Sequence, residues 1–441
     1  GSRARMRARL LAGAILAGAA LIGWLSITST LVARLLQGAI VLSLFYVGYL
    51  AWRGYLVMRR AITGAEPATA AHAHASDLAR LSVVVPAANE ASVIGGIVGD
   101  LAFQHYEAAA DDLELVVIDD GSSDGTADAA RAASSRVRVL RREPGSGAAT
   151  KGAALAWAAP QLRGDLVAVL DADSRVAPDF LRAAVRAWQR DRTAAALQVQ
   201  RRAINRTRGW LPAAQDEEQL MDMASQCGRW ATDGTAELRG NGMFVRREAL
   251  ERAGGWPTHA LTEDLDLSTR LTGVGERVVL APEVVVQEQA VEGATDLWQQ
   301  RLRWAEGSLR RLIEHGPGLV GNRQLPFGRR LDFLLFIGEF LIPPVFVTSI
   351  AASLLTIPLP EPADWTVPVT LFVGYGLGTY LLALAGLAAQ GEPILSLLGR
   401  ATRGALFLSH WLLIVPAALL RITFGPANPT FARTPRITPG A

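Results

Sequence analysis

Five long apolar runs constrain the folding of this 441-residue chain more than any other feature of its sequence. Two of them, residues 10–31 and 35–52, come early, and three more, residues 331–357, 367–389 and 405–420, lie in the last third. About 20 apolar residues are enough for a helix to cross a bilayer. Half of the chain (50%) is hydrophobic and only 19% is charged, which is too apolar for an ordinary soluble enzyme. The sequence therefore predicts a membrane protein whose polar section lies between two groups of membrane helices.

The charges beside the first two runs predict an orientation. Four arginines lie between residues 3 and 9, and Arg59 and Arg60 follow the second run. Because Lys and Arg are enriched on the cytoplasmic side of membranes, these runs predict a hairpin with both ends in the cytoplasm. We expect the inner membrane of a bacterial cell, with the polar section on its cytoplasmic side.

The topology of the C-terminal runs has two interpretations. The loop PLPEPADW at 358–365 carries acids and no Lys or Arg, so it is expected outside. Five spans would then place the C-terminus outside, although Arg421, Arg433 and Arg436 favour the cytoplasm. Alternatively, one of the last three runs is re-entrant or interfacial, with residues 394–398 beside it.

Composition divides the chain into parts. Residues 61–79 are rich in Ala, Thr, Pro and His and predict a linker; His72 and His74 within it are weak metal-ligand candidates. The predicted parts are a transmembrane hairpin (1–60), a linker (61–79), an α/β domain (80–292), an amphipathic interfacial helix and loop (293–330), C-terminal transmembrane helices (331–425) and a basic tail (426–441).

Strand and helix patterns alternate after residue 80. Apolar strand patterns start at residues 81, 113, 136 and 166, and helical patterns fill the gaps around 90–104, 126–134, 150–159 and 178–190. This alternation predicts a mostly parallel, Rossmann-like sheet with helices on both faces. Ligands bind such sheets at the carboxyl ends of the strands. No GxGxxG follows the first strand, which argues against a dinucleotide-dependent dehydrogenase.

Acidic residues gather at these predicted strand ends and at loop starts. They are Asp119 and Asp120, Asp171 and Asp173, and Glu263, Asp264 and Asp266. Two carboxylates directly after a strand, as in Asp171-Ala172-Asp173, suit a divalent cation whose remaining ligands are diphosphate and water. Alone, such a pair is more often a surface turn.

Other residues of the α/β section are candidates for nucleotide binding. Asp120 follows a second strand and is predicted to contact the base or ribose. The base pocket is predicted to be lined by Pro86, Ala87, Asn89 and Glu90, and Lys151 is expected to pair with a phosphate, although a lone lysine is usually solvated.

Residues 296–313 predict a helix with two distinct faces, followed by a loop at 316–324. At about 100° per residue, one face carries Trp298, Leu302, Ala305, Leu309 and Leu312, and the other carries Gln300, Arg303, Trp304 and Gly307. The first face suits a membrane edge or a core. The second presents an amide, a guanidinium and an indole, which can hydrogen-bond and stack on a sugar. The alternative is an ordinary amphipathic surface helix.

Two further observations exclude other classes. The net charge of +3 does not argue for a nucleic-acid partner, and none is predicted. The single cysteine, Cys227, excludes an intramolecular disulfide and a cysteine zinc site.

Six short motifs, in this order, resemble those of the membrane-bound family-two inverting glycosyltransferases. They are PAANE (86–90), DDGSSDGT (119–126), DAD (171–173), GNGMFVRR (240–247), TED (262–264) and QQRLRW (299–304). The resemblance implies a GT-A fold, a nucleotide-sugar donor and Mg²⁺ or Mn²⁺. Residues 288–312 are most similar to the monoglucosyldiacylglycerol synthases, which transfer glucose from UDP-glucose to diacylglycerol. The segment NPTFARTPR (428–436) loosely resembles a basic C-terminal motif of the family.

The resemblance also implies residue roles. Asp120 would hold uridine, and Asp173 would bind the metal with Asp171 beside it. Asp264 would be the general base, and Glu263 would orient the site. The acceptor sugar or the diphosphate would be held by Gln300, Arg303, Trp304 and Gly242.

The predicted function is inverting transfer of glucose from UDP-glucose to 1,2-diacylglycerol in the membrane. One alternative is a processive polysaccharide synthase, which would normally need more spans for a secretion channel. Another is a non-catalytic nucleotide-sugar-binding membrane protein, which would be expected to lack part of the carboxylate set; all of that set is present here.

Overall fold

A computed structural model describes residues 2–64, 80–106, 112–191, 193–358, 365–426. His72, His74, most of the predicted linker, most of the loop at 358–365 and the segment 428–436 lie outside the described residues. The chain forms two compact units. Among the described residues, the sheet unit comprises those within 58–219 and 235–291, and the helical unit comprises those within 2–57, 220–234 and 292–426.

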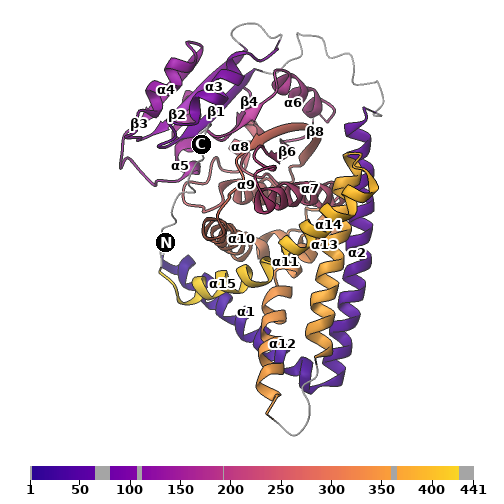
Figure 1. The fold of residues 1–441 in the computed structure, drawn as a ribbon. Coiled ribbons are helices and arrows are strands. Elements are labelled where there is room, and N and C mark those ends of the chain that lie inside the picture. The colour runs from indigo at the N-terminus through magenta and orange to yellow at the C-terminus, as the bar shows by residue number, and fades with distance from the viewer. Residues whose placement is uncertain (1, 65–79, 107–111, 192, 359–364, 427–441) are drawn as a thin grey trace. The chain divides into compact units, whose positions relative to one another are not determined.

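The sheet unit contains one eight-stranded sheet with the strand order β3-β2-β1-β4-β7-β6-β8-β5 (Figure 1). The strands are β1 (Leu81–Ala87), β2 (Leu113–Asp120), β3 (Val137–Arg142), β4 (Leu166–Val169), β5 (Arg175–Val176), β6 (Ala196–Ala203), β7 (Met243–Arg246) and β8 (Val278–Glu288). The pairings among β1 to β4, and that of β6 with β8, are parallel. β7 is antiparallel to both of its neighbours, and β5 is antiparallel to β8. The predicted mostly parallel α/β fold is confirmed.

Helices cover both faces of this sheet. They are α3 (Ile94–Ala102), α4 (Thr126–Ala133), α5 (Lys151–Ala158), α6 (Phe180–Gln189), α8 (Arg247–Arg252) and α9 (Glu263–Gly273). α3, α4 and α6 share a core with Leu81, Val83 and Val85, and α5 packs against β1, β2 and β3 (Figure 1). Residues 81–85 of β1 are all buried, as expected for a central parallel strand covered on both faces.

The helical unit is assembled from three segments of the chain. It contains α1 (Ser2–Thr28), α2 (Thr30–Ile62), the end of α7 (Trp210–Ala231), α10 (Ala294–Gly321), α11 (Phe327–Glu339), α12 (Ile342–Thr356), α13 (Thr366–Ala389), α14 (Ile394–Leu408) and α15 (Trp411–Phe424). Among the described residues, five stretches are long and apolar enough to cross a membrane: Arg5–Thr28, Thr30–Ile62, Phe327–Thr356, Thr366–Ala389 and Ile394–Phe424. They correspond to the five runs predicted from sequence, except that the predicted runs 10–31 and 331–357 extend beyond Thr28 and Thr356.

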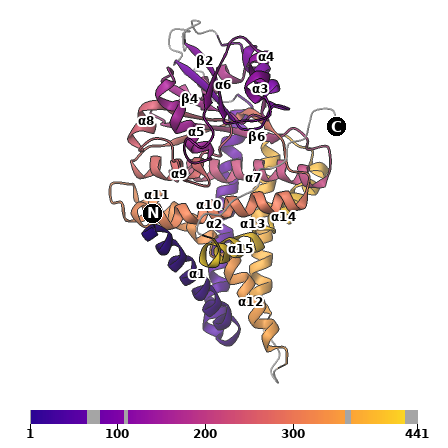
Figure 2. The same cartoon turned by 90° about the vertical axis from the view of Figure 1, so that its left-hand side faces the viewer.

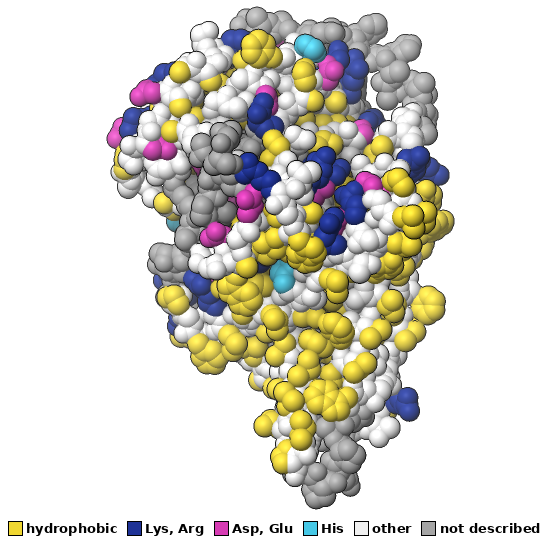
Figure 3. Space-filling view, in the orientation of Figure 1, with side chains coloured by type: hydrophobic (Ala, Val, Ile, Leu, Met, Phe, Trp, Pro, Cys, Tyr) yellow, Lys and Arg dark blue, Asp and Glu magenta, His cyan; other side chains and the backbone are white. Residues whose placement is uncertain are grey.

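The outer surface of these helices is apolar. Figure 3 shows hydrophobic side chains over much of the lower part of the molecule, where these helices lie. On α2, for example, Leu42 and Phe45 are 71% and 75% exposed. Large exposed apolar side chains on a long apolar helix are expected where the solvent is lipid, so the helical unit has the surface of a membrane domain.

Close backbone contact and a buried ion pair hold α2, α7 and α11 together. A Cβ atom on Gly54 would lie 2.0 Å from the Ala224 carbonyl oxygen, and one on Gly228 would lie 2.2 Å from that of Leu50. The Arg229 guanidinium is 3.0 Å from the Asp332 carboxylate, which also accepts a hydrogen bond from the Tyr46 hydroxyl at 3.2 Å. The glycines let the two helices touch, and the ion pair links them to α11.

The predicted loop at 316–324 is wrong for residues 316–321. α10 continues to Gly321 with Pro317 inside the helix. Proline removes one helical hydrogen bond, but the last turn is held by packing, because Leu319 is buried in a cluster with Leu312, Leu325 and Phe333.

Candidate active site

Hydrogen bonds join the loop after β1 (residues 88–90) to the loop after β2 (residues 121–126), and we call these two loops the nucleotide wall. Asn89 has a positive φ of 57°, which turns its backbone towards the second loop. Its N–H donates to Ser122 Oγ at 2.9 Å, and its side-chain oxygen accepts from the Ser123 N–H at 2.9 Å. The next residue, Glu90, donates its N–H to Thr126 Oγ1 at 2.9 Å. The loops of two separate motifs, PAANE and DDGSSDGT, are therefore joined by hydrogen bonds.

The ends of β1 and β2 bring the other predicted nucleotide residues to this wall. Pro86 and Ala87 close β1, where they pair in register with Ile118 and Asp119. Asp120 closes β2, and its carboxylate accepts from Arg142 Nε at 2.5 Å. Because Arg142 comes from the neighbouring strand β3, the position of the Asp120 side chain is fixed from the sheet edge.

Lys151 lies at the centre of a cluster of acidic groups. Its Nζ is 2.5 Å from Asp171 Oδ1, 3.6 Å from Glu263 Oε1 and 2.7 Å from the Gly240 carbonyl oxygen. Burial by itself favours the neutral amine, but Asp171 and Glu263 raise the pKa of Lys151 above its usual value. The lysine is therefore charged, and it contacts residues from three of the predicted motifs.

Glu263 and Asp264 begin helix α9 beside this lysine. Burial raises the pKa of Glu263 to about 7, although Lys151 acts in the opposite direction. Burial also raises the pKa of Asp264, and Lys151, Arg239 and Arg201 limit the rise. Two adjacent carboxylates with raised pKa values beside a charged lysine are typical of a functional site rather than of a surface.

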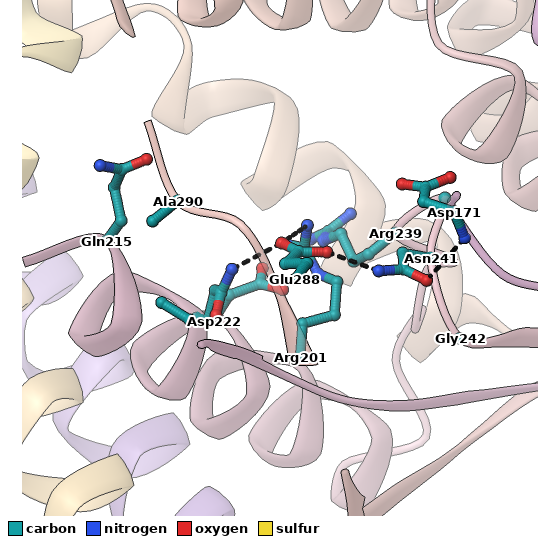
Figure 4. A network of polar contacts seen from close by, with 12 residues as sticks. Asp171, Arg201, Gln215, Asp222, Arg239, Asn241, Gly242, Glu288 and Ala290 are labelled. Atoms are coloured by element: carbon teal, nitrogen blue, oxygen red, sulfur yellow. Dashed lines mark hydrogen bonds and ion pairs between the residues drawn. The ribbon is translucent and has the colours of Figure 1, made fainter. Parts of the chain in front are cut away.

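A buried network supports the turn that carries Asp171 and Asp173. Asn241 accepts hydrogen bonds at its side-chain oxygen from the Asp171 N–H and from Ser174 Oγ, at 3.1 and 3.0 Å. Its side-chain nitrogen donates to Glu288 Oε2 at 2.8 Å (Figure 4). Sequence reasoning missed Asn241 and Glu288 as site residues. The available signals were the position of Asn241 inside the GNGMFVRR motif and that of Glu288 at the end of an apolar strand.

Gly242 occupies a packed position in the sheet. Its φ is +69°, and a Cβ atom there would lie 2.4 Å from Val199 and 2.8 Å from Val286. Its N–H donates to the Val169 carbonyl oxygen at 3.0 Å. These contacts explain why the position is a glycine, and its role towards an acceptor or a diphosphate stays a prediction.

The predicted acceptor residues Gln300, Arg303 and Trp304 all lie half-buried on α10, in the helical unit. Within the described part of the chain, the side-chain oxygen of Gln300 is buried without a hydrogen-bond partner. Neighbouring Arg301 stacks on the Trp304 ring, with its guanidinium carbon 4.1 Å from the ring centroid. The guanidinium of Arg301 therefore covers one face of the Trp304 indole.

α10 differs from the two-faced helix predicted from sequence. Ala305, Leu309 and Leu312 are buried as expected, but Trp298 is 43% exposed. Glu306 is fully buried, and it pairs with Arg310 at 2.7 Å and with Arg421 of α15 at 3.3 Å. Because charged groups are buried as well, the buried side of α10 is not purely apolar, and α10 is not a simple amphipathic helix.

The residues present fit a divalent cation only if the substrate completes its shell. No group of three or more His, Cys, Asp or Glu side chains that could hold a metal occurs among the described residues. Asp171 and Asp173 supply carboxylate oxygens, which suit Mg²⁺ and Mn²⁺. Mg²⁺ is commonly held by one or two carboxylates together with substrate phosphates.

Known proteins resemble both the sequence and the fold. The β-monoglucosyldiacylglycerol synthase of Synechocystis sp. is 32% identical over 80% of this chain and 74% of its own length. The enzyme of the same name from Trichormus variabilis is 32% identical over 80% of this chain and 76% of its own length. The solved structure of a mannosyltransferase from Pyrobaculum calidifontis, in complex with GDP-Man and Mn²⁺, has a TM-score of 0.59 at 21% identity. That match covers 88% of this chain and 98% of the other, and it supports the fold alone.

The expected GT-A fold is thus confirmed. Residues 79–307 match the family described as glycosyltransferase-like family 2, and these residues contain all six motifs. With the identity to the two synthases over most of their length, this match shows that the chain belongs to the family-2 glycosyltransferases.

Proposed function

We propose that this protein is a membrane-bound inverting glucosyltransferase that transfers glucose from UDP-glucose to the free hydroxyl of 1,2-diacylglycerol. The observation that carries the chemistry is the cluster of Lys151, Asp171, Glu263 and Asp264. The choice of glucose and diacylglycerol rests on the two relatives named β-monoglucosyldiacylglycerol synthase.

In this proposal the wall formed by the loops after β1 and β2 binds the nucleotide. Asn89 and Glu90 come from one loop, and Asp120, held by Arg142, faces uridine from the end of β2. Asp171 and Asp173 would hold Mg²⁺ or Mn²⁺ against the diphosphate, where the ion neutralises charge on the departing UDP. Lys151, fixed between Asp171 and Glu263, adds a positive charge next to the phosphates.

Asp264 is the proposed general base. It takes the proton from the lipid hydroxyl while that oxygen bonds to C1 of the glucose, and the bond from C1 to the UDP oxygen breaks on the opposite face. A base works best with a pKa near the working pH, and burial raises the pKa of Asp264 towards that range. Glu263 and Lys151 position the charges around it.

The acceptor side is proposed to involve Gln300, Arg303 and Trp304 of α10. The buried side-chain oxygen of Gln300 can accept from a hydroxyl group, and the indole of Trp304 can stack on a sugar ring. An acceptor dissolved in the bilayer requires a membrane-bound enzyme, and the apolar helices of the helical unit supply that attachment. We further propose the cytoplasmic side of the inner membrane for the sheet unit, from the arginines at residues 5–9 and 59–60.

The test is product analysis with the purified full chain in vesicles that contain diacylglycerol and Mg²⁺. We expect label from UDP-[¹⁴C]glucose in a chloroform-soluble lipid. A β-glucosidase should release labelled glucose from this lipid, and UDP-galactose should give much less label. Label in a water-soluble polymer would replace the proposal with a polysaccharide synthase. Binding of UDP-glucose without any transfer would indicate a non-catalytic nucleotide-sugar-binding protein.

A further inference from the structure

Asn241 contacts both ends of the turn that carries the two metal-binding candidates, Asp171 and Asp173. Its side-chain oxygen accepts from the backbone N–H of Asp171 at 3.1 Å and from the hydroxyl of Ser174 at 3.0 Å. The turn itself closes with a bond from the Ser174 N–H to the Asp171 carbonyl oxygen at 3.0 Å. Asn241 is only 1% exposed, so water does not compete for these bonds.

Glu288 determines which end of the Asn241 amide faces this turn. A carboxylate only accepts hydrogen bonds, so Glu288 Oε2 binds the side-chain nitrogen of Asn241, at 2.8 Å, and the amide oxygen must point the other way. Glu288 Oε1 is held by Gln219 at 2.6 Å and lies 3.4 Å from Arg201 (Figure 4). A reversed amide would present its N–H groups to the Asp171 N–H and would not support the turn.

The end of β8 also reaches the second carboxylate of the turn. Gln289, directly after Glu288, donates its N–H to Asp173 Oδ2 at 3.3 Å. This strand end therefore contacts the Asp173 carboxylate directly, and it supports the backbone of Asp171 through Asn241. Groups that orient metal ligands typically change metal affinity 10- to 100-fold when they are removed.

We propose that Glu288 and Asn241 are positioning residues that hold the turn carrying Asp171 and Asp173 and thereby determine how tightly the divalent cation binds. The inference rests on the metal site of the proposed function. Under this inference Glu288 affects metal affinity through Asn241, without contact with the substrate.

The test uses the full chain in detergent, with Mn²⁺ binding in the presence of UDP followed by electron paramagnetic resonance. We expect Asn241→Ala and Glu288→Gln to raise the half-saturating Mn²⁺ concentration about tenfold or more. At saturating Mn²⁺ the KM for the sugar donor should change less than threefold, and excess metal should restore most of the rate.

Glu283→Gln is the matched control, because Glu283 lies in the same strand and pairs with Arg190 away from the turn. It should leave Mn²⁺ affinity unchanged. Unaltered Mn²⁺ affinity in a folded Asn241→Ala protein would overturn the inference, as would an equal loss of affinity in the control. A parent protein that binds Mn²⁺ with UDP but makes no glucolipid would refute the proposed function without contradicting this inference.

A second inference concerns the last apolar run and rests on the packing of the helical unit. α12 runs parallel to α1, since Phe340, just before α12, packs against the cluster that contains Ala8 and Ala12, and Ser349 lies against Gly23. α13 likewise runs parallel to α2: Val367 shares a core with Ala33, and Leu381 meets Gly48. After α13 the chain is therefore back on the membrane side where α1 begins.

The run after α13 is broken into two short helices. α14 has 15 residues and α15 has 14, with a break at Ser409 and His410. At 1.5 Å per residue these lengths are about 22 and 21 Å. α11 and α12 are equally short, so the direction of α15, and not helix length, distinguishes the last run. α15 meets the first part of α1, where Thr423 lies 3.4 Å from the Cβ position of Gly13 and Arg9 donates to the Gly425 carbonyl oxygen at 2.6 Å (Figure 2).

We infer that α14 and α15 form a re-entrant pair, so the described part of the chain crosses the membrane four times. The pair starts and ends on the side where α1 starts. The partner of its outward face is lipid: Leu395 is 85% exposed, and Leu398 and Leu406, also exposed, lie on the same side of α14. This topology removes the conflict between five spans and the position of Arg421.

Single cysteines in a Cys227→Ser background test the inference with a membrane-impermeant maleimide on oriented vesicles. The sites Arg5→Cys, Thr30→Cys, Pro393→Cys and Phe424→Cys are all exposed. We expect Phe424→Cys and Pro393→Cys to label from the same side as Arg5→Cys, and Thr30→Cys from the other. Labelling of Phe424→Cys from the side of Thr30→Cys would overturn the inference and establish a fifth crossing.

Discussion

Buried charges are arranged differently in the two units. In the sheet unit, Asp171, Glu263 and Asp264 lie around Lys151, and Arg239 and Arg201 also act on Asp264. In the helical unit, Asp332 lies against Arg229, and Glu306 lies against Arg310 and Arg421. Burial of a charge is costly unless it is compensated. We therefore interpret the acidic cluster, in which Asp171 and Glu263 share one lysine, as the place where a cation and a proton act, and the acid–arginine pairs of the helical unit as structural.

The largest effect should come from the acidic cluster. Asp264→Asn removes the proposed base, and loss of a general base typically costs about 100- to 10,000-fold in rate. UDP binding should be retained, because the nucleotide wall is built from other loops. Turnover is measured as glucolipid formation, and UDP binding by calorimetry.

Asp266→Asn is the matched control for that variant. Asp266 lies on the same helix and pairs with Arg270 at 2.7 Å. Near-normal turnover is expected for it, and substantial turnover in Asp264→Asn would refute the assignment of the base.

A structural pair should affect stability instead of chemistry. Asp332→Asn leaves Arg229 buried without its counter-charge and should cost about 3–5 kcal/mol. The double variant Arg229→Met, Asp332→Leu should recover most of that loss, because both charges are gone. Thermal unfolding in detergent measures both. A single variant as stable as the parent would show that this pair is not structural.

Two substitutions around the base should shift the pH dependence of kcat in opposite directions. The base must be ionised, so the rate falls as the pH drops through its pKa. Lys151→Met removes a positive charge that lowers the pKa of Asp264 and should move the acid limb to higher pH. Glu263→Gln removes a neighbouring negative charge and should move the limb to lower pH. Shifts in the same direction would contradict electrostatic control of Asp264.

The smallest effect is expected at an exposed pair of the sheet unit. Arg80 and Asp165 are 3.1 Å apart, and both side chains are 58% exposed. Exposed pairs are screened by water and salt. Arg80→Ala should therefore change neither thermal stability nor turnover measurably. A clear loss of either would show that exposed charge pairs matter as much as the buried charges compared above.

Sequence patterns predicted the parts of the fold that have strong periodicity or composition. The strands that begin at residues 81, 113, 137 and 166 are apolar, and the membrane helices are long, so both were predicted. β6 was missed because buried Gln198 and Gln200 interrupt its apolar pattern. Their side-chain nitrogens donate to backbone carbonyl groups, Gln198 to Asn241 and Gln200 to Gln219, which a linear pattern cannot reveal.

The same limit applies to the candidate site. Motifs predicted the acidic residues, and the structure places Lys151 among them. The support from Glu288 through Asn241 joins positions 47 residues apart, and the contact of Asn241 with Asp171 joins positions 70 apart. Such bonds depend on the strand order of the finished sheet, which neither spacing nor composition determines.

The three-segment construction of the helical unit has a consequence for biosynthesis. Arg9 finds its partner, the Gly425 carbonyl, 416 residues later, and Tyr46 finds Asp332 286 residues later. During translation the first hairpin is therefore in the membrane without these partners until the sheet unit and the later helices have been synthesised. Interruption of synthesis before α15 would leave the small residues Ala8 and Ala12 of α1 without the helix that covers them. Such nascent chains are natural targets for membrane chaperones and quality-control proteases.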